Sequence, residues 1–447
     1  MTLRHHLAIR ICGIAAASLL ALPAPALADV RDTDAICGLT QGEEARLAED
    51  RPDIQARAAI VVGDDGTVYF ERDADEEVKI ASLTKVMTAI LAIENADMDD
   101  ELTVGHRAAT VGQSTAELKE GDVLTMEEAL RGLMIPSGND AAMAIAEHVG
   151  AIIEPGSSDP YAAFIKAMND KAAELGMDHT VFANPHGLDF DGWEGDFHST
   201  ARDVATMFSH AMKSDRFRAL TASPDNKITV TSADGSEREI DMIERNEILG
   251  REGNIGGKTG GTYDADSCFV GAFSRETGGE VYTVTLGSED GEQRWADTLA
   301  LANWYYDHVV AYPLGKSTRS TADGRVLVAR APHADWTDKS IDVVLSDPDQ
   351  TAEVFSLAGD VEVEWRLDEL HGKISEGDAV GSLALMQNGE ELARGELLSA
   401  ESQDAPGGLD WLMVRLDRLV RLVTGQPRTA EEAHFVETPS PRELDRA

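Results

Sequence analysis

Hydrophobic and polar positions follow several different periods along this chain of 447 residues. After a polar lead, apolar runs at 58–62 and 67–70 flank a Gly-Asp-Asp-Gly turn, which indicates a β-hairpin. From about residue 81 to residue 214, apolar positions recur every three or four residues, as on the buried faces of α-helices. Strand-like runs return afterwards, at 254–260, 268–274 and 281–287. With a final helical pattern at 292–310, this order predicts an α+β domain at 43–312, in which a largely helical insertion interrupts one antiparallel sheet.

A second pattern begins near residue 312, where short runs of alternating apolar and polar residues are regularly spaced. These runs lie at 326–329, 341–345, 361–365, 380–386 and 392–398. Such spacing is typical of a small β-sandwich. We therefore predict a β-sandwich domain at 313–402, ended by the Pro-Gly-Gly linker at 406–408.

Segment 407–425 shows a different period, because its apolar residues fall on one face of a helix. They are Leu409, Leu412, Met413, Leu416, Leu419, Val420 and Val423. Arg415, Arg418 and Arg421 lie off that face, and the segment is too short and too charged to span a bilayer. We predict an amphipathic helix lying at a membrane surface; the alternative is a helix packed on the β domain. The tail at 426–447 is predicted to be disordered.

Residues 1–28 have the composition of a Sec-type signal peptide. Arg4 and Arg10 form a basic start, an apolar run follows at 11–22, and Ala26-Leu27-Ala28 is a cleavage site before Asp29. The mature protein is therefore predicted to be exported.

Composition narrows the class of protein. With 43% hydrophobic and 27% charged residues the chain is globular, and its net charge of −42 excludes a nucleic-acid partner. An exported chain permits a disulfide between Cys37 and Cys268. The apolar run that begins at Cys268 instead favours a buried thiol at that position.

Three short motifs carry the chemistry: Ser82-Leu83-Thr84-Lys85, Ser137-Gly138-Asn139 and Lys258-Thr259-Gly260. Each is weak alone, but together and in this order they are the elements of the penicillin-interacting serine enzymes. A serine hydroxyl becomes a nucleophile when a neighbour takes its proton. Lys85, one helical turn after Ser82 and desolvated beside a second cation, is the predicted base.

The other motif residues are predicted to bind the substrate and to move a proton. Ser137 is expected to pass a proton to the leaving amine, and Asn139 to hold the peptide amide. A substrate carboxylate is expected to bind a cation and two hydroxyls, those of Lys258, Thr259 and Thr262. The backbone N–H groups of Ser82 and Gly261 are the candidate oxyanion hole.

On these motifs the chain resembles the low-molecular-mass penicillin-binding proteins that are D-alanyl-D-alanine carboxypeptidases, from about residue 58 to 308 and more weakly through 371–399. The resemblance implies a penicillin-recognising transpeptidase-like fold and a periplasmic location at the inner membrane. It also implies peptidoglycan stem peptides ending in D-Ala-D-Ala as substrate and β-lactams as covalent inhibitors. It further implies that Arg245 helps to bind the carboxylate. In one departure, Gly261 stands where the family usually has a bulky residue.

Several alternatives stay open. A D,D-endopeptidase that cuts peptidoglycan cross-links would use the same motifs. A β-lactamase is disfavoured because the chain has no Glu-x-x-Leu-Asn segment, and a non-enzymatic wall-binding scaffold would not need Ser82, Lys85 and Lys258. His186 is predicted to belong to a structural loop. The histidines show no HExxH spacing, so we predict neither a metal nor a cofactor.

Overall fold

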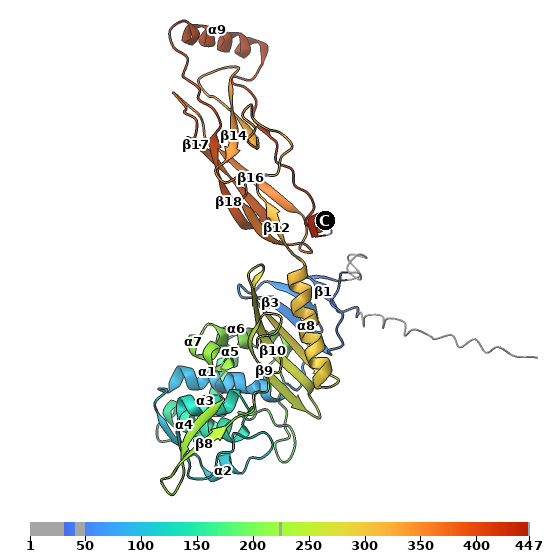
Figure 1. The fold of residues 1–447 in the computed structure, drawn as a ribbon, viewed down its shortest axis with the longest axis vertical. Helices are drawn as coiled ribbons and strands as arrows, with labels where there is room; N and C mark the ends of the chain where they lie inside the picture. The colour runs from blue at the N-terminus through green and yellow to red at the C-terminus, as the bar shows by residue number, and fades with distance from the viewer. Residues whose placement is uncertain (1–30, 41–49, 223–225, 446–447) are drawn as a thin grey trace, which may run out of the picture.

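The computed structural model describes residues 31–40, 50–222 and 226–445. The predicted signal peptide and its cleavage site lie outside these residues. Figure 1 shows an elongated molecule with the first domain at one end, the β domain stacked beyond it and helix α9 at the far end.

The first domain is built on a seven-stranded antiparallel sheet with the order β2-β1-β4-β3-β11-β10-β9. Its strands are β1 (Ala35–Ile36), β2 (Leu39–Thr40), β3 (Ala58–Gly63), β4 (Val68–Arg72), β9 (Asn254–Thr262), β10 (Asp266–Arg275) and β11 (Gly279–Ser288). The predicted antiparallel sheet is therefore confirmed. The polar lead adds strands β1 and β2. Each has only two residues, too few to show a periodic pattern in the sequence. Strand β9, which carries Lys258, lies at an edge.

Helices cover both faces of this sheet (Figure 1). Helix α8 (Gly291–Asp307) packs on one face, with contacts to β10 and β11. The insertion supplies a short 3₁₀ helix η1 (Ala81–Thr84) and helices α1 (Lys85–Asn95), α2 (His106–Ala109), α3 (Met126–Met134), α4 (Asn139–Ile153), α5 (Pro160–Glu174), α6 (Ala201–Met212) and α7 (Asp215–Thr221). It also forms a small sheet that the sequence did not reveal, of β5 (Glu101–Thr103), β6 (Val123–Thr125), β7 (Lys227–Thr231) and β8 (Glu237–Asp241).

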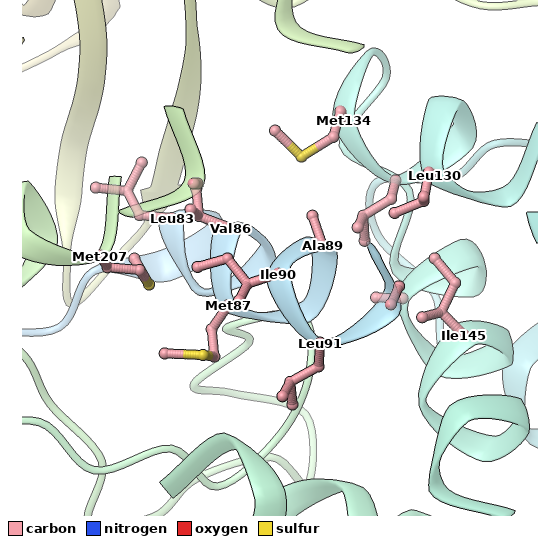
Figure 2. Packing of buried hydrophobic residues seen from close by; sticks show 14 of the residues in the cluster. Leu83, Val86, Met87, Ala89, Ile90, Leu91, Leu130, Met134, Ile145 and Met207 are labelled. Carbon is pink, nitrogen blue, oxygen red and sulfur yellow. The ribbon is translucent and has the colours of Figure 1, made fainter. Parts of the chain in front are cut away.

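Helix α1 is the centre of the largest core cluster. Its residues from Lys85 to Ala92 are all buried, and Figure 2 shows Val86, Met87 and Ile90 among side chains from α3, α4 and α6. A helix that is apolar on all sides is stable only when other elements surround it. The packing therefore fixes the start of α1, where Ser82 and Lys85 lie.

The second domain is all antiparallel, as predicted. One sheet has the order β16-β17-β18-β14-β13-β19, and β12 pairs with β15 in a second. The bounds are β12 (Val309–Pro313), β13 (Ala329–Pro332), β14 (Ser340–Leu345), β15 (Thr351–Phe355), β16 (Val361–Leu367), β17 (Ala379–Gln387), β18 (Glu390–Ser399) and β19 (Ala433–His434). Both sheets contribute to one core. Trp365 of β16 stacks on His434 of β19 at 4.2 Å, so the two outer strands of the larger sheet meet and the sheet is curled.

Helix α9 (Leu409–Thr424) faces outward with its apolar side. All seven residues of the predicted stripe are exposed, from 48% for Leu412 to 87% for Val423. The helix approaches the β domain with polar groups instead, since Arg418 donates to the carbonyl of Ala334 at 2.6 Å. The alternative of a stripe packed on the β domain is therefore wrong. Within the described residues, no helix is long and apolar enough to cross a membrane.

The prediction of a disordered tail is wrong for the described residues up to 445. Strand β19 pairs with β13, and the N–H of Phe435 donates to the carbonyl of Val328 at 2.9 Å. The ring of Phe435 lies under the guanidinium of Arg319, and Val436 packs on the β-domain core. The polar composition of this segment predicted disorder. The segment is ordered nevertheless, because two strand residues pair with β13 and a few side chains pack on the β domain.

The end of the tail reaches the junction between the domains, as Figure 1 shows at the C-terminus. Pro439 accepts a hydrogen bond from the hydroxyl of Tyr312 at 2.9 Å. In helix α10 (Pro441–Asp445), Arg442 forms an ion pair with Asp50 of the first domain. Asp445 accepts from the hydroxyl of Ser356 at 3.0 Å. The tail therefore ties the β domain to the first domain.

Cys37 and Cys268 are separate free thiols in the structure. Cys268 is fully buried, and burial raises the pKa of its thiol to about 12. It therefore acts as a small apolar side chain in the core.

We expect truncation after Gly425 to lower the melting temperature of the β domain by several degrees. It removes the β19 ladder, a stacked ring pair and an ion pair, each worth on the order of 0.5–1.5 kcal/mol. Arg442→Ala should reproduce about 1 kcal/mol of this loss, whereas Arg428→Ala, an exposed arginine in the same tail, should have no effect. Calorimetry of the three variants checks this; unchanged melting of the truncated chain would contradict the anchoring.

Candidate active site

Ser82 and Lys85 meet at the start of the buried helix. The Nζ of Lys85 lies 2.8 Å from the Oγ of Ser82, because a spacing of three residues places both on one side of a helical turn. Ala81, which precedes Ser82, has a left-handed backbone with φ of +47°. Ser82 is partly exposed while Lys85 is fully buried, so the serine is the point at which the pair reaches the surface.

Lys85 is surrounded by oxygen atoms. Besides Ser82, its Nζ donates to Oδ1 of Asn139 at 2.8 Å and to the carbonyl of His186 at 2.9 Å. Burial lowers the pKa of Lys85 well below its usual value, and the charge of Lys258 lowers it further, against an opposing effect of Asp140. A neutral amine in this position has a lone pair that can accept the proton of the Ser82 hydroxyl.

The second motif lies on the loop between α3 and α4. Helix α3 begins with a capping box of Thr125 and Glu128 and ends just before Pro136. The loop residue Ser137 is buried and left-handed, with φ of +63°. This conformation brings its Oγ within 2.8 Å of the Nζ of Lys258. Asn139 starts α4 and links Lys85 to the loop at Gly112, to whose carbonyl its Nδ2 donates at 3.0 Å.

Lys258 is buried on β9, and its pKa is also shifted from the ordinary value of a lysine. Its Nζ donates to Ser137 and to the carbonyl of Thr259, both at 2.8 Å. Burial lowers the pKa of Lys258 to about 7; Glu244 opposes this shift, and the cations Arg294 and Arg245 add to it. Near neutral pH this ammonium can therefore be either charged or neutral.

Side chains alternate along β9, and this decides which of them reach the serine. Lys258 points to Ser137, and a Cβ on Gly260 would lie 2.7 Å from the carbonyl of Ile80. Thr262 continues the same face, but its hydroxyl donates to Asp189 at 2.6 Å and accepts from the N–H of Ala265. The hydroxyl of Thr262 is therefore engaged by protein groups in this structure, and its contact with a substrate carboxylate stays a prediction.

Thr259 and Gly261 lie on the opposite face of β9, toward α8. There Arg294, which the sequence reading missed, donates from Nη1 to the carbonyl of Gly260 at 3.3 Å. No local signal reveals Arg294, because its contact depends on α8 crossing this face. Arg245 is exposed and close enough to depress the pKa of Lys258. The structure thus brings Lys258 together with two arginines.

The loop at 184–191 closes the site from another side. Gly187 has φ of +84°, and a Cβ there would lie 1.8 Å from the carbonyl of Ala81. Only glycine permits this contact with the turn of the nucleophile. His186 contacts Lys85 through its backbone oxygen, while its ring packs edge-on against Trp193 at 4.5 Å. The ring therefore has a packing contact.

Asp140 is a second residue that the sequence reading missed. Its buried carboxylate accepts from the N–H groups of Ala116 and Leu118 and from the hydroxyl of Thr115. It thereby fixes the loop that follows α2 next to Asn139. Across the described ranges, no group of three or more His, Cys, Asp or Glu side chains is placed to hold a metal ion.

This fold, with the three motifs meeting at one point, defines the class of penicillin-recognising serine enzymes. The chain belongs to the D-alanyl-D-alanine carboxypeptidase family, whose model matches residues 45–290. It is thus a homologue of the low-molecular-mass penicillin-binding proteins, as the motifs indicated.

Curated relatives and solved structures agree with this assignment. The chain is 27% identical to D-alanyl-D-alanine carboxypeptidase DacF of Bacillus subtilis over 370 residues, which cover 80% of this chain and 88% of the relative. It is 31% identical to DacC of Escherichia coli over 58% of this chain and 63% of the relative. A Streptomyces DD-transpeptidase structure aligns with a TM-score of 0.52 and 30% identity over 57% of this chain and 98% of its own. The Francisella tularensis carboxypeptidase DacD, at 22% identity, shares the fold over 79% of this chain and 96% of its own, with a TM-score of 0.53.

The protonation of Lys258 should make the rate of acylation depend on pH. Below a pKa of about 7 this lysine is an ammonium that attracts a carboxylate, and above it the attraction is lost. We expect the second-order rate of acylation by a penicillin, which carries a carboxylate, to fall as the pH rises through about 7. Lys258→Arg should remove this fall, although its overall rate is lower, because a guanidinium stays charged.

The control is Lys227→Arg, the same change at an exposed position of β7, which should keep the wild-type profile. Stopped-flow acylation rates between pH 5 and pH 9 check the expectation. An identical alkaline limb in wild type and Lys258→Arg would exclude Lys258 as its cause.

Proposed function

We propose that this protein is a serine-type D-Ala-D-Ala carboxypeptidase that removes the terminal D-Ala from peptidoglycan pentapeptides through an acyl-enzyme. The observation that carries the proposal is the contact of 2.8 Å between Ser82 and Lys85, a fully buried lysine whose pKa is strongly lowered. A hydroxyl beside a neutral amine is the arrangement that covalent catalysis requires. Family membership supplies the substrate class.

In the proposed acylation, the Oγ of Ser82 attacks the carbonyl of the penultimate D-Ala while Lys85 takes its proton. The charge that develops on the carbonyl oxygen is stabilised by the backbone N–H groups of Ser82 and Gly261. The hydroxyl of Ser137, hydrogen-bonded to Lys258, relays the proton taken up by Lys85 to the nitrogen of the leaving D-Ala, so that Lys85 is neutral again and Ser137 keeps its hydroxyl. Asn139 holds the peptide amide beside Lys85. Water then hydrolyses the ester and restores Ser82.

The terminal carboxylate determines which bond breaks. In the proposed complex it binds at the free edge of β9, which borders both faces of the strand, near Lys258 and Thr259, with Arg294 and Arg245 as additional cations. A carboxylate is favoured there because charged donors on the protein then meet a charged acceptor. An internal cross-link has no free carboxylate at this position. For this reason the carboxypeptidase reaction is preferred over the endopeptidase reaction.

We further propose that the mature protein is periplasmic and lies on the inner-membrane surface through α9. The supporting observation is that α9 exposes its apolar stripe and directs Arg418 to the β domain. A helix with this polarity stabilises itself by burying the stripe among lipid chains. Leu416 and Leu419, at 50% and 60% exposure, lie in the middle of the stripe.

For the reaction, we expect the mature protein to release one D-Ala from a pentapeptide and to be labelled by penicillin on Ser82. Ser82→Ala should abolish both activities, and Lys85→Ala should slow acylation by about a hundredfold, the scale of losing a general base. Amidating the C-terminal carboxylate of the peptide should remove most of the turnover. Mass spectrometry of the labelled peptide and an assay for free D-Ala make these measurements.

Other outcomes select the alternatives. Cleavage of cross-linked dimers with intact pentapeptides would establish the endopeptidase. Undiminished penicillin labelling of Ser82→Ala would refute the assigned nucleophile. Absence of both labelling and turnover in a folded protein would favour the wall-binding scaffold.

For the membrane, we expect the mature chain to sediment with vesicles that contain anionic lipid. Leu416→Asp and Leu419→Asp should each release it, because each places a charge in the buried face at a cost of about 2 kcal/mol or more. These point variants keep the anchored tail, which a truncation before α9 would remove. Leu392→Asp, the same change at a partly exposed position of β18, is the control that should stay bound. Wild-type protein that remains in the supernatant would exclude the membrane contact.

A further inference from the structure

Asp140 is a buried carboxylate to which the proposed reaction gives no role. It is 3% exposed and lies in the first turn of α4. Both of its oxygens receive hydrogen-bond donors, which is the arrangement of an ionised carboxyl group. The donors are the N–H groups of Ala116, Leu118 and Ala141, at 2.9 to 3.0 Å, and the hydroxyl of Thr115, at 2.6 Å.

Three of these four donors belong to the loop at 112–118, which follows α2. The backbone of this loop is left-handed at three places, with φ of +81° at Gly112, +64° at Gln113 and +59° at Glu117. Left-handed residues other than glycine are strained and persist only where surrounding contacts hold them. The carboxylate of Asp140 supplies such contacts, so the loop depends on it for its shape.

Gly138, the middle residue of the second motif, lets the loop come this close. A Cβ at Gly138 would lie 2.6 Å from Oδ1 of Asp140 and 2.9 Å from the backbone nitrogen of Ala116. Any larger residue would therefore push the loop away from the carboxylate. The motif glycine, the carboxylate and the loop form one packed unit.

The loop decides which end of the Asn139 side chain faces Lys85. A carbonyl only accepts, so Nδ2 is the atom of Asn139 that meets the carbonyl of Gly112, at 3.0 Å. The other end of the amide, Oδ1, then lies 2.8 Å from Nζ of Lys85 and accepts one of its protons. The backbone N–H of Asn139 also donates to the carbonyl of Ser114 at 2.8 Å. A neutral amine that donates to Oδ1 keeps its lone pair for the hydroxyl of Ser82.

Asp140 also contributes a negative charge near the amine. The ionisable groups that face Lys85 are Lys258 on β9, His186 in the loop at 184–191 and Asp140 on α4. Burial lowers the pKa of Lys85, the charge of Lys258 lowers it further, and the carboxylate of Asp140 opposes both effects. Burial also lowers the pKa of the His186 ring, which is therefore neutral near pH 7. Among these groups, Asp140 is the one that carries a negative charge.

We propose that Asp140 is a positioning residue for the acylation step. Through the loop at 112–118 it directs Oδ1 of Asn139 at Lys85, and through its charge it offsets the second cation, Lys258. The inference rests on the proposed function, because it takes Lys85 to be the base for Ser82.

The test compares Asp140 with Asp203, a second buried carboxylate in the same domain. Asp203 accepts from the hydroxyl of Thr180 at 2.7 Å and from the N–H of His179 at 3.1 Å, and it is not among the groups that face Lys85. Asp140→Asn removes the charge and nearly keeps the shape, whereas Asp140→Glu keeps the charge and displaces the oxygens. Asp203→Asn is the matched control.

The readouts are the rate of acylation by penicillin between pH 5 and pH 9 and the NMR titration of the ε-carbon of Lys85, which is assigned by its loss in Lys85→Arg. For Asp140→Asn we expect the maximal rate to fall about tenfold, because an amide places a donor against the N–H groups of the loop. Its rate at acid pH, relative to that maximum, should rise about tenfold, because an ammonium without the carboxylate loses its proton at lower pH. Asp140→Glu should lower the maximum and keep the acid limb, and Asp203→Asn should keep both.

A second pair of variants tests the positioning while the buried carboxylate stays in place. Thr115→Val removes one donor to Asp140, and Thr180→Val removes the corresponding donor to Asp203. We expect Thr115→Val to acylate about threefold more slowly with an unchanged acid limb, the scale of one hydrogen bond. The amides of the loop at 112–118 should also exchange faster with solvent. Thr180→Val should acylate like wild type.

The measurements separate this inference from the proposed function. If Asp140→Asn leaves the titration of Lys85 where it is in wild type, the role of the charge is overturned. Wild-type maximal rates in both Asp140→Glu and Thr115→Val overturn the positioning. A shifted titration and a faster-exchanging loop in a protein that penicillin does not label keep the role of Asp140 beside Lys85 and overturn the acyl-enzyme reaction.

Discussion

The burial of Lys85 is the constraint on which the site depends. A buried ammonium is costly, and the cost falls either when the amine loses its proton or when every N–H finds an oxygen. The structure provides both, because three oxygens surround Nζ and the pKa is strongly lowered. These oxygens come from η1, α4 and the loop at 184–191, so three distant segments of the chain must meet at one nitrogen. The central position of α1 in the core is what makes that meeting possible.

The cost of this arrangement is visible in the backbone. Ala81 and Ser137 are both left-handed without being glycine, which costs on the order of 1–3 kcal/mol each. Each strained residue directs a hydroxyl: Ala81 precedes the serine that meets Lys85, and Ser137 itself meets Lys258. The surrounding core, not the local sequence, holds these conformations. Loss of core packing around α1 should therefore affect acylation before it unfolds the domain.

The sequence predicted the parts of the structure that are encoded locally. Motif spacing placed Ser82 and Lys85 on one side of a helical turn, and their Oγ and Nζ atoms lie 2.8 Å apart. It failed where a contact depends on the way whole elements cross, as for Arg294 on α8. It also could not reveal that the hydroxyl of Thr262 donates to Asp189, which comes from a distant loop. The small sheet β5–β8 and the tail were missed because very short strands carry almost no periodic signal.

The tail gives the β domain a role beyond that of a spacer. Helix α9 is not the end of the chain, since the residues after it return along the β domain and contact the first domain through Arg442 and Asp50. The segments before and after α9 therefore both contact the β domain, which limits how far the helix can tilt or detach. If α9 lies on a membrane, the height and orientation of Ser82 above that membrane are set by the stacked domains and by the tail that joins them (Figure 1). If the protein acts on peptidoglycan as proposed, such an arrangement would restrict the serine to stem peptides within a limited range of distances from the lipid surface.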